Sequence, residues 1–162
     1  MLSAHREKWR EVPGGSDVDG RLFSTTLLDL PDSELLALWG KMAERRISEE
    51  LGWIDTLYRD YFKGKRVLDV GSGLGLNGMQ FSAHGADWTF ADIVPDNITL
   101  LRKIARLKGL SPSFHLIGDD LLFDGLGEFD AVFACGSLHH VPFALAKREC
   151  ANIAKHLKLV DR

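Results

Sequence analysis

Cysteine is scarce in this sequence, and the long apolar runs of membrane proteins are absent from it. The 162 residues include two cysteines, Cys135 and Cys150, which form no paired motif. This scarcity argues against a disulfide framework or a zinc site and favours a reducing compartment. No apolar run approaches the roughly 18 residues of a membrane-spanning helix, and the polar N-terminus does not resemble a signal peptide. These absences favour a soluble, cytoplasmic protein without a membrane partner.

A charge excess of one sign is missing as well. The formal net charge is -3 at pH 7, which provides no general attraction for a polyanion, so nucleic acid is not an expected partner. The basic residues within 63–66 and 102–108 fit a solvated helix face. No metal site is expected either, because the isolated histidines lack the spacing of metal ligands: His5, His84, His115 and His156.

The hydrophobic content of 45% is sufficient for the core of one domain. Residues 1–30 are rich in turn formers and are predicted to be a weakly ordered arm. Apolar residues recur at three-to-four spacing over 31–47 and again over 48–63, which predicts two helices. The chain is therefore expected to comprise an N-terminal arm with a helical extension (1–63) and a second domain (64–162).

Short apolar runs alternate with helical patterns after residue 64. The predicted strands are 66–70, 88–92, 114–117 and 130–135, and the predicted helices are 76–83, 95–107 and 143–157. Strands that are apolar throughout are buried on both faces, and their alternation with helices indicates a parallel sheet. The sequence therefore predicts an α/β fold, a Rossmann-like doubly wound parallel sheet with an N-terminal helical extension.

A glycine-rich turn follows the first predicted strand. Glycine permits positive φ angles and lets a ligand approach the main chain, while the helix after the turn presents unpaired N–H groups. Two patterns overlap here: Gly73-Leu74-Gly75-Leu76-Asn77-Gly78 satisfies the dinucleotide fingerprint G-x-G-x-x-G, and Gly71-Ser72-Gly73-Leu74-Gly75 satisfies the shorter G-x-G-x-G. Asp69 favours the second pattern, because its carboxylate would repel a pyrophosphate and suits a cationic ligand.

From about residue 64 to 157 the chain resembles the class I methyltransferases that use S-adenosylmethionine (SAM), of the methyltransferase-domain type. The landmarks occur in the order of that family: the turn at 69–75, Asp92 after the second strand, 118–120 after the third strand and 136–142 after the fourth. The resemblance implies SAM as the cofactor and a strand order of 3-2-1-4.

The resemblance also implies a cofactor site, residue by residue. The methionyl end of SAM would lie against Asp69, Gly71, Ser72, Gly73, Gly75 and Cys135. Asp92 would accept hydrogen bonds from the ribose hydroxyls, and Ile93 would pack against the adenine. The carboxylate of Asp119 would accept from the adenine amino group, and Asp120 would offer its backbone N–H to the ring; the sequence leaves open which of the two acidic side chains points inward. Structural roles stay open too, because Asp92 could cap the next helix and the Asp119–Asp120 pair could simply end a strand.

His139 and His140 are the candidates for catalysis. A histidine on the loop that faces the transferring methyl group could remove the proton of a hydroxyl acceptor; a structural or cofactor-edge role is the alternative. The two helices within 31–63 would either pack against the sheet or form a lid over the acceptor. In the second case Trp53, Tyr58 and Tyr61 are candidate substrate contacts.

The family's fifth to seventh strands, with the Pro-Gly-Gly-like turn before them, do not occur before Arg162. The fourth predicted strand would then form an apolar sheet edge, which is prone to association. A truncated chain is the favoured interpretation. The alternatives are a second chain or a homo-oligomer that completes the sheet, and coverage of the sheet by the N-terminal helices.

These patterns together predict a SAM-dependent methyltransferase that acts on a small-molecule acceptor. One alternative is an NAD(P)-dependent oxidoreductase that uses the literal G-x-G-x-x-G, although Asp69 and the 118–120 landmark argue against it. The other alternative is a non-catalytic SAM-binding or interaction module, which the missing strands suggest.

Overall fold

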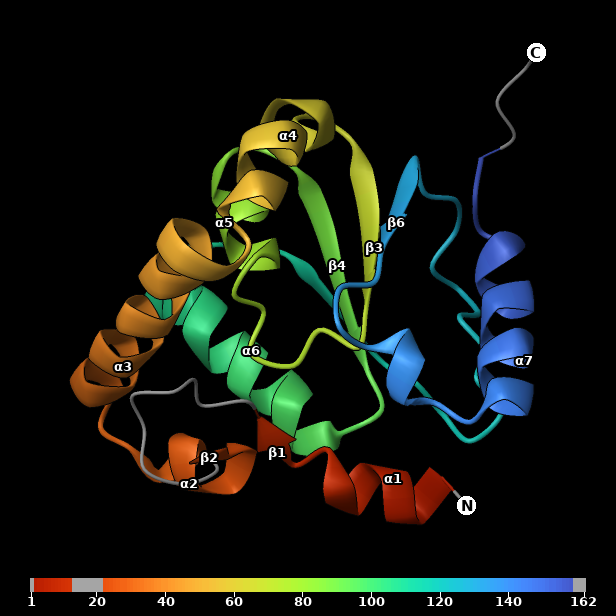
Figure 1. Ribbon diagram of the computed structural model, residues 1–162, viewed down its shortest axis with the longest axis horizontal. Helices are drawn as coiled ribbons and strands as arrows, with labels where there is room; N and C mark the ends of the chain where they lie inside the picture. The colour runs from red at the N-terminus through yellow and green to blue at the C-terminus, as the bar shows by residue number, and fades with distance from the viewer. Residues whose placement is uncertain (1, 13–21, 159–162) are drawn as a thin grey trace.

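The structure, a computed structural model, describes residues 2–12 and 22–158. Its centre is a parallel sheet whose strands are β3 (Arg66–Val70), β4 (Asp87–Asp92), β5 (Ser113–Leu116) and β6 (Ala131–Phe133). The order across the sheet is β5-β4-β3-β6, so β3, the first of these strands along the chain, lies between β4 and β6 (Figure 1). The predicted α/β fold class is confirmed.

The helices of this domain are α5 (Gly78–Ala83), α6 (Pro95–Leu107) and α7 (Phe143–Ala154), and a short 3-10 helix, η2 (Leu138–His140), precedes α7. Helix α6 has the predicted bounds, because Pro95 occupies its first turn and Gly109 follows its end with a φ of +67°. Helix α5 begins later than predicted, since Leu76 and Asn77 still belong to the turn before it.

Helices α3 (Asp32–Arg45) and α4 (Gly52–Phe62) form the predicted helical extension. Between them lies η1 (Arg46–Glu50), one turn of π-helix that is closed by a 2.8 Å hydrogen bond from the N–H of Leu51 to the carbonyl oxygen of Arg46. The second helix therefore starts at Gly52 and not near Ser48. Sequence periodicity could not place this boundary, because the π-turn carries the chain from one helix almost directly into the next.

The prediction of a weakly ordered arm over residues 1–30 is wrong for the part that the structure describes. This part comprises α1 (Leu2–Lys8), β1 (Glu11–Val12), β2 (Leu22–Phe23) and α2 (Ser24–Asp29), and β1 and β2 form a small antiparallel sheet that was not predicted. Polar contacts hold the segment in place: the N–H of Ser24 donates to the carbonyl oxygen of Arg10 at 2.9 Å, and Lys103 on α6 donates to that of Leu28 at 3.0 Å. Residues 13–21 lie outside the described residues.

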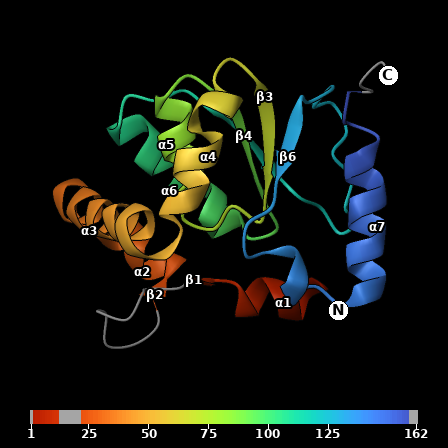
Figure 2. The same cartoon turned by 45° about the horizontal axis from the view of Figure 1, so that its top comes forward.

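Each face of the parallel sheet has its own core. On one face Val67 and Trp88 pack with side chains of α3, α4, α5 and α6; on the other face Leu68 packs with Phe129 and with Ile153 of α7. The alternation of Val67 and Leu68 between the two cores follows from the two-residue period of a strand. Figure 2 shows α7 on one side of the sheet and α4 and α5 on the other, as a doubly wound fold requires.

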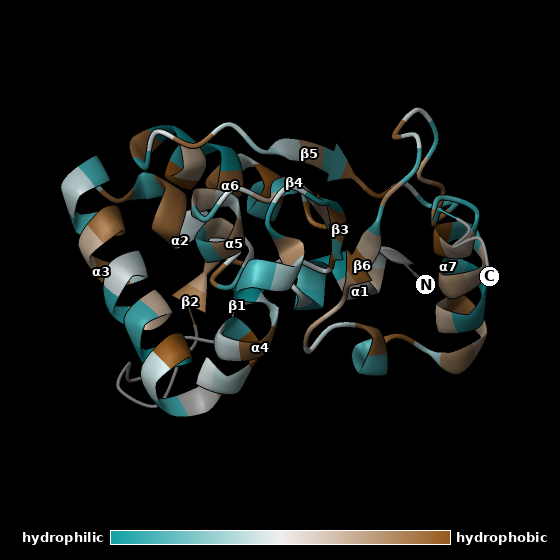
Figure 3. Ribbon diagram, turned by 90° about the horizontal axis from the view of Figure 1, so that it is seen from above, coloured by the Kyte–Doolittle hydropathy of each residue, from teal (hydrophilic) through white to brown (hydrophobic). Residues whose placement is uncertain are grey.

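Helices α3 and α7 lie at opposite ends of the molecule (Figures 1 and 3). Strand β6 borders the sheet on the α7 side, and its only ladder within residues 2–12 and 22–158 is with β3. The N-terminal helices reach one face of β6, where Phe62 of α4 meets Phe133 edge to face at 6.1 Å between ring centroids. The expected partner chain or second copy at the outer edge stays a prediction. None of the described helices is long and apolar enough to cross a membrane.

Candidate functional site

A cavity of about 700 Å³ opens at the carboxyl ends of the parallel strands. Ligands of α/β sheets bind at this edge, and the volume lies within the range of small-molecule sites. The wall combines the glycine turn, the ends of β4 and β5, the segment after β6, and α7. On the N-terminal side it includes the second half of α3, Arg46 of η1, and Trp9 and Glu11. The cavity is therefore built from both predicted parts of the chain.

The glycine turn forms one wall of the cavity. Gly71, Gly73 and Gly75 have φ angles of +71°, +52° and +64°, a region that side chains other than glycine rarely occupy. A β-carbon on Gly75 would lie 2.6 Å from Leu101 Cδ2, whereas one on Gly73 would meet no atom within 4 Å. The lack of a side chain at Gly75 thus lets the turn pack closely against the core. At Gly73 it leaves open space along the cavity.

Two hydroxyl groups fix the turn to its strands. The Ser72 hydroxyl donates to the carbonyl oxygen of Asp69 at 2.8 Å, and the N–H of Ala91 donates to the Ser72 oxygen at 3.1 Å. The Ser137 hydroxyl, from the segment after β6, donates to the carbonyl oxygen of Val70 at 2.7 Å. The N–H groups of the turn glycines also donate within the protein: Gly71 to the carbonyl oxygen of Ala91, Gly73 to Oδ2 of Asp92 and Gly75 to the carbonyl oxygen of Ser72. Together these bonds hold the turn in one conformation, so it needs little reorganisation to meet a ligand.

Asp69 lies buried beneath the turn and lines the cavity. Its Oδ2 accepts a 3.0 Å hydrogen bond from the indole Nε1 of Trp88. Burial raises the pKa of Asp69 to about 7; the Trp88 bond lowers it in part, and the nearby charge of Asp92 raises it further. A cationic group in the cavity would relieve this burial cost, so the residue fits a positively charged ligand.

Asp92 lies at the end of β4, is also buried, and faces the same cavity. Its Oδ2 accepts from the N–H of Gly73 at 2.9 Å, and its Oδ1 accepts from the N–H of Val94 at 2.9 Å. Burial raises the pKa of Asp92, while these backbone bonds oppose the shift. Asp92 therefore ties the glycine turn to the start of α6, and the side chain of Asn97 and the N–H of Ile93 also bond to its carboxyl group.

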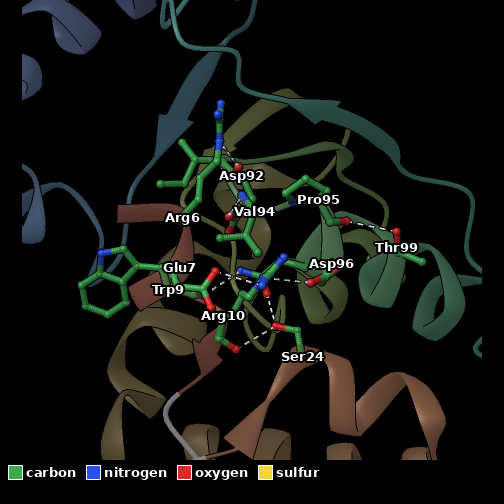
Figure 4. A network of polar contacts seen from close by, with 12 residues as sticks. Arg6, Glu7, Trp9, Arg10, Ser24, Asp92, Val94, Pro95, Asp96 and Thr99 are labelled. Atoms are coloured by element: carbon green, nitrogen blue, oxygen red, sulfur yellow. Dashed lines mark hydrogen bonds and ion pairs between the residues drawn. The ribbon is translucent and has the colours of Figure 1, made fainter. Parts of the chain in front are cut away.

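Helix α1 closes over the ends of β4 and β5 through Arg6, which lies close to Asp92 and Val94 in Figure 4. Its Nε donates to the carbonyl oxygen of Ile93 at 2.9 Å and its Nη2 to that of Ile117 at 3.2 Å. Its Nη1 lies 2.6 Å from Oδ1 of Asp119. Sequence reasoning missed Arg6, because nothing in the polar N-terminus indicates where the helix would dock.

Asp119 and Asp120, the predicted adenine contacts, do not line the cavity. The side chain of Asp119 is 75% exposed and pairs with Arg6, and Oδ1 of Asp120 accepts from the N–H of Leu122 at 3.1 Å. The cavity wall at this end consists of Ile93, Ile117 and Leu121. The other predicted cofactor residues do line the cavity: Asp69, Gly71, Ser72, Gly73, Gly75, Asp92, Ile93 and Cys135.

His139 and His140 also line the cavity, from η2. Their rings lie 3.7 Å apart between centroids, and the ring of Trp9 packs against His140 at 4.4 Å. Desolvation lowers the pKa of His140, and the charges of His139 and Lys8 lower it further. The neutral imidazole of His140 is therefore favoured near pH 7.

On the side of the N-terminal helices, Arg46 reaches the cavity from η1. Its Nε donates to Oδ1 of Asn77 at 3.2 Å, and its Nη2 lies 3.6 Å from Sγ of Cys135. Cys135 thus contacts a cation as part of the wall.

Trp53, Tyr58 and Tyr61, the candidate substrate contacts on α4, do not line the cavity. Helix α4 buries Ile54 and Phe62 against the sheet, which turns the three aromatic residues outward with exposures of 57%, 39% and 53%. Trp9 and Arg46 line the cavity where the three aromatic residues of α4 were expected.

Glu149 of α7 is a further cavity residue that sequence reasoning missed. It is 4% exposed, and its carboxyl group forms no hydrogen bond or ion pair with any residue in 2–12 or 22–158. A signal was present in the sequence: Glu149 lies in line with Leu145, Asn152 and Ile153 on the inner face of α7, where an acidic residue is unexpected.

Comparison with known proteins gives a family match and partial relatives. A family model described as a methyltransferase domain matches residues 67–159. The chain is 40% identical over 98 residues to a ubiquinone biosynthesis O-methyltransferase of Xanthomonas oryzae pv. oryzae, covering 57% of this chain and 39% of that protein. It is 38% identical over 98 residues to the enzyme of the same name from Xylella fastidiosa, covering 57% and 38%. The chain thus spans about two fifths of the length of these curated relatives.

Solved structures share the fold at low sequence identity. Magnesium protoporphyrin IX methyltransferase from Synechocystis PCC 6803, with bound SAM, superposes with a TM-score of 0.58 at 19% identity, over 96% of this chain and 67% of that one. An S-adenosylmethionine-dependent methyltransferase from Clostridium acetobutylicum ATCC 824 gives 0.55 at 15% identity, over 74% and 53%.

Proposed function

The chain belongs to the methyltransferase-domain family, and on this premise we propose that it binds SAM and transfers the methyl group to a small-molecule acceptor. The observation that carries the proposal is the joint position of the glycine turn, Asp69 and Asp92 around one cavity. The turn lets a ligand approach the main chain closely at Gly73, where a β-carbon would meet no atom within 4 Å, and the two buried carboxyl groups suit a cation and a pair of hydroxyls. A ligand that carries a positive charge and a pair of hydroxyl groups therefore fits this cavity.

The chemistry of the residues in the cavity wall indicates which part of SAM each of them binds. Asp69 and the turn hold the charged methionyl end, with Cys135 on the opposite side. Asp92 accepts the ribose hydroxyls, because its carboxyl group faces the cavity from the end of β4. Ile93, Ile117 and Leu121 provide an apolar slot for the flat base.

The acceptor binds between η2 and the N-terminal helices. When bound, SAM supplies a methyl group on a positively charged sulfur, and transfer is an in-line displacement that depends on alignment and on exclusion of water. Trp9 and Leu38 provide apolar surface on this side. His140 is suited to take the proton of a hydroxyl acceptor, because its lowered pKa favours the neutral ring. The curated relatives named as O-methyltransferases support an oxygen acceptor.

Residues 1–63 act as a cap on this site, and residues 64–162 form the cofactor domain. Support comes from Arg6, whose three contacts bind α1 to the strand ends, and from the position of Trp9 and Arg46 in the cavity wall. A cap of this kind encloses the cofactor, and α3 and η1 then line the side of the cavity on which the acceptor binds.

The proposal is tested by calorimetry on the 162-residue chain with S-adenosylhomocysteine and with NADH. We expect binding of the first and none of the second. Binding of NADH alone would favour an oxidoreductase and overturn the proposal. Transfer of radiolabelled methyl groups from SAM to a panel of small phenols and catechols then tests turnover. Cofactor binding without transfer to any acceptor would favour the non-catalytic module.

A further inference from the structure

Among the residues that the structure describes, three buried carboxyl groups line the cavity, and their hydrogen bonding differs. Asp69 accepts from the Trp88 indole, and Asp92 accepts from two backbone N–H groups. Glu149 is 4% exposed and has no hydrogen bond or ion pair with any described residue. A buried polar group is normally hydrogen-bonded to protein, water or a ligand, so the partner of the Glu149 carboxyl group must come from the cavity that it lines.

The place of Glu149 in the cavity follows from the contacts of α7. Asn152, three residues later on the same helix face, donates through Nδ2 to the carbonyl oxygen of Leu121 at 2.8 Å. Arg148 donates through Nη2 to the carbonyl oxygen of Asp119 at 3.1 Å. This turn of α7 is therefore docked on the segment after β5, and Glu149 faces the end of the cavity that Leu121 lines.

Apolar side chains surround that end of the cavity. Ile93 and Ile117 follow the paired residues Asp92 and Leu116 of neighbouring strands, and Arg6 binds the carbonyl oxygens of both isoleucines. Their side chains and Leu121 form a slot in which Glu149 is the polar group without a partner. A flat ring that carries a hydrogen-bond donor on one edge fits such a slot.

We propose that Glu149 binds the amino edge of the adenine ring of the cofactor, in place of Asp119 or Asp120. The inference rests on the proposed function, since it assigns the adenosine end of the ligand to this part of the cavity. The adenine edge carries an amino donor beside a ring-nitrogen acceptor. A carboxylate accepts from the amino group, and a protonated carboxyl group can also donate to the ring nitrogen.

The electrostatics of the site agree with this role. Burial raises the pKa of Glu149, and the negative charge of Asp92 raises it further. A hydrogen-bond donor beside the carboxyl group would offset the burial cost. Asp119 is unsuited to the task because its carboxylate pairs with Arg6 outside the cavity, and Asp120 is engaged with the N–H of Leu122.

The experiment compares two ligands by calorimetry: S-adenosylhomocysteine and its purine analogue, in which hydrogen replaces the 6-amino group. The unmodified protein is expected to prefer the amino compound by about tenfold, the value of one hydrogen bond to a buried carboxyl group. Glu149→Ala should remove most of this preference. Glu149→Gln should retain it, because a glutamine side chain also pairs with the adenine edge.

Asp119→Ala and Asp120→Ala are the matched controls, and both should keep the preference. A preference that survives in Glu149→Ala, or that disappears in either control, overturns the inference. Absence of S-adenosylhomocysteine binding to the unmodified protein contradicts the proposed function itself, and the inference with it.

Thermal unfolding of Glu149→Ala without ligand provides a second reading. Removal of a buried carboxyl group without a partner should leave the melting temperature unchanged or raise it, since alanine also favours the helix. A marked fall in melting temperature would indicate a structural partner for Glu149 and would overturn the inference.

Discussion

At the scale of single residues, the buried carboxyl groups link stability to pH. The pKa of Asp69 is about 7 in the folded chain against 3.8 for an ordinary aspartate. Folding therefore favours the protonated form, and the stability from this linkage is complete below about pH 3.8 and is lost as the pH rises through about 7. Asp92 and Glu149 act in the same direction, because burial raises their pKa values too.

Asp69→Asn tests this linkage. The asparagine oxygen can still accept from the Trp88 indole, while the buried charge is removed. Without ligand at pH 8, we expect the free energy of unfolding to increase by about 2–4 kcal/mol, with a smaller gain at pH 5. Urea denaturation at the two pH values measures the difference. An equal gain at both would show that Asp69 does not titrate between them.

Asp92→Asn tests the bond between the glycine turn and α6. An asparagine keeps one oxygen and places an N–H group against a backbone donor, either Gly73 or Val94. We expect a loss of about 1–3 kcal/mol in the free energy of unfolding, together with weaker S-adenosylhomocysteine binding. Asp96→Asn is the control, since it affects a partly exposed pair with Arg10 and should cost less than about 1 kcal/mol. Equal losses in the two variants would contradict the assignment.

At the scale of elements, two glycines of the same turn should respond differently to alanine. At Gly75 the new methyl group would collide with Leu101 and Phe90 in the core, whereas at Gly73 it would meet no atom within 4 Å. Gly73→Ala should cost about 1–2 kcal/mol, the penalty of a left-handed φ for alanine. Gly75→Ala should cost more, because overpacking adds about 1–3 kcal/mol. Urea midpoints of the two variants provide the comparison, and similar midpoints would count against the packing argument.

Helix α1 should depend on Arg6 for its attachment to the strand ends. Arg6→Ala removes the bonds to Ile93, Ile117 and Asp119, and we expect amide hydrogen exchange within Leu2–Glu11 to become faster by at least tenfold. Lys8→Ala is the control on the same helix, because the Lys8 ammonium group lies over the neighbouring ring of Trp9, 5.0 Å from its centroid. Exchange that is equally fast in both variants would mean that Arg6 does not hold the helix.

At the scale of the whole molecule, the sequence predicted the parallel sheet more accurately than the way in which the surrounding helices pack on it. The alternation of apolar runs and helical patterns was sufficient for the α/β class, and the resemblance to class I SAM-dependent methyltransferases is confirmed by the family match. The docking of α1 could not be predicted in this way, and the position of Glu149 on the inner face of α7 did not reveal that its carboxyl group has no protein partner among the described residues. Both depend on contacts between residues far apart in the chain, such as Arg6 with Ile117.

A ligand in the cavity should therefore stabilise the molecule as one unit. The walls of the cavity come from the N-terminal segment, the glycine turn and α7. A bound ligand should therefore slow amide hydrogen exchange in all three regions together. At about 100 times its dissociation constant, S-adenosylhomocysteine should add about 2.7 kcal/mol to the free energy of unfolding. That gain corresponds to a rise in melting temperature of roughly 5–10 °C. NADH at equal concentration should cause no shift, and protection confined to the glycine turn would argue against a cavity shared by the cap and the cofactor domain.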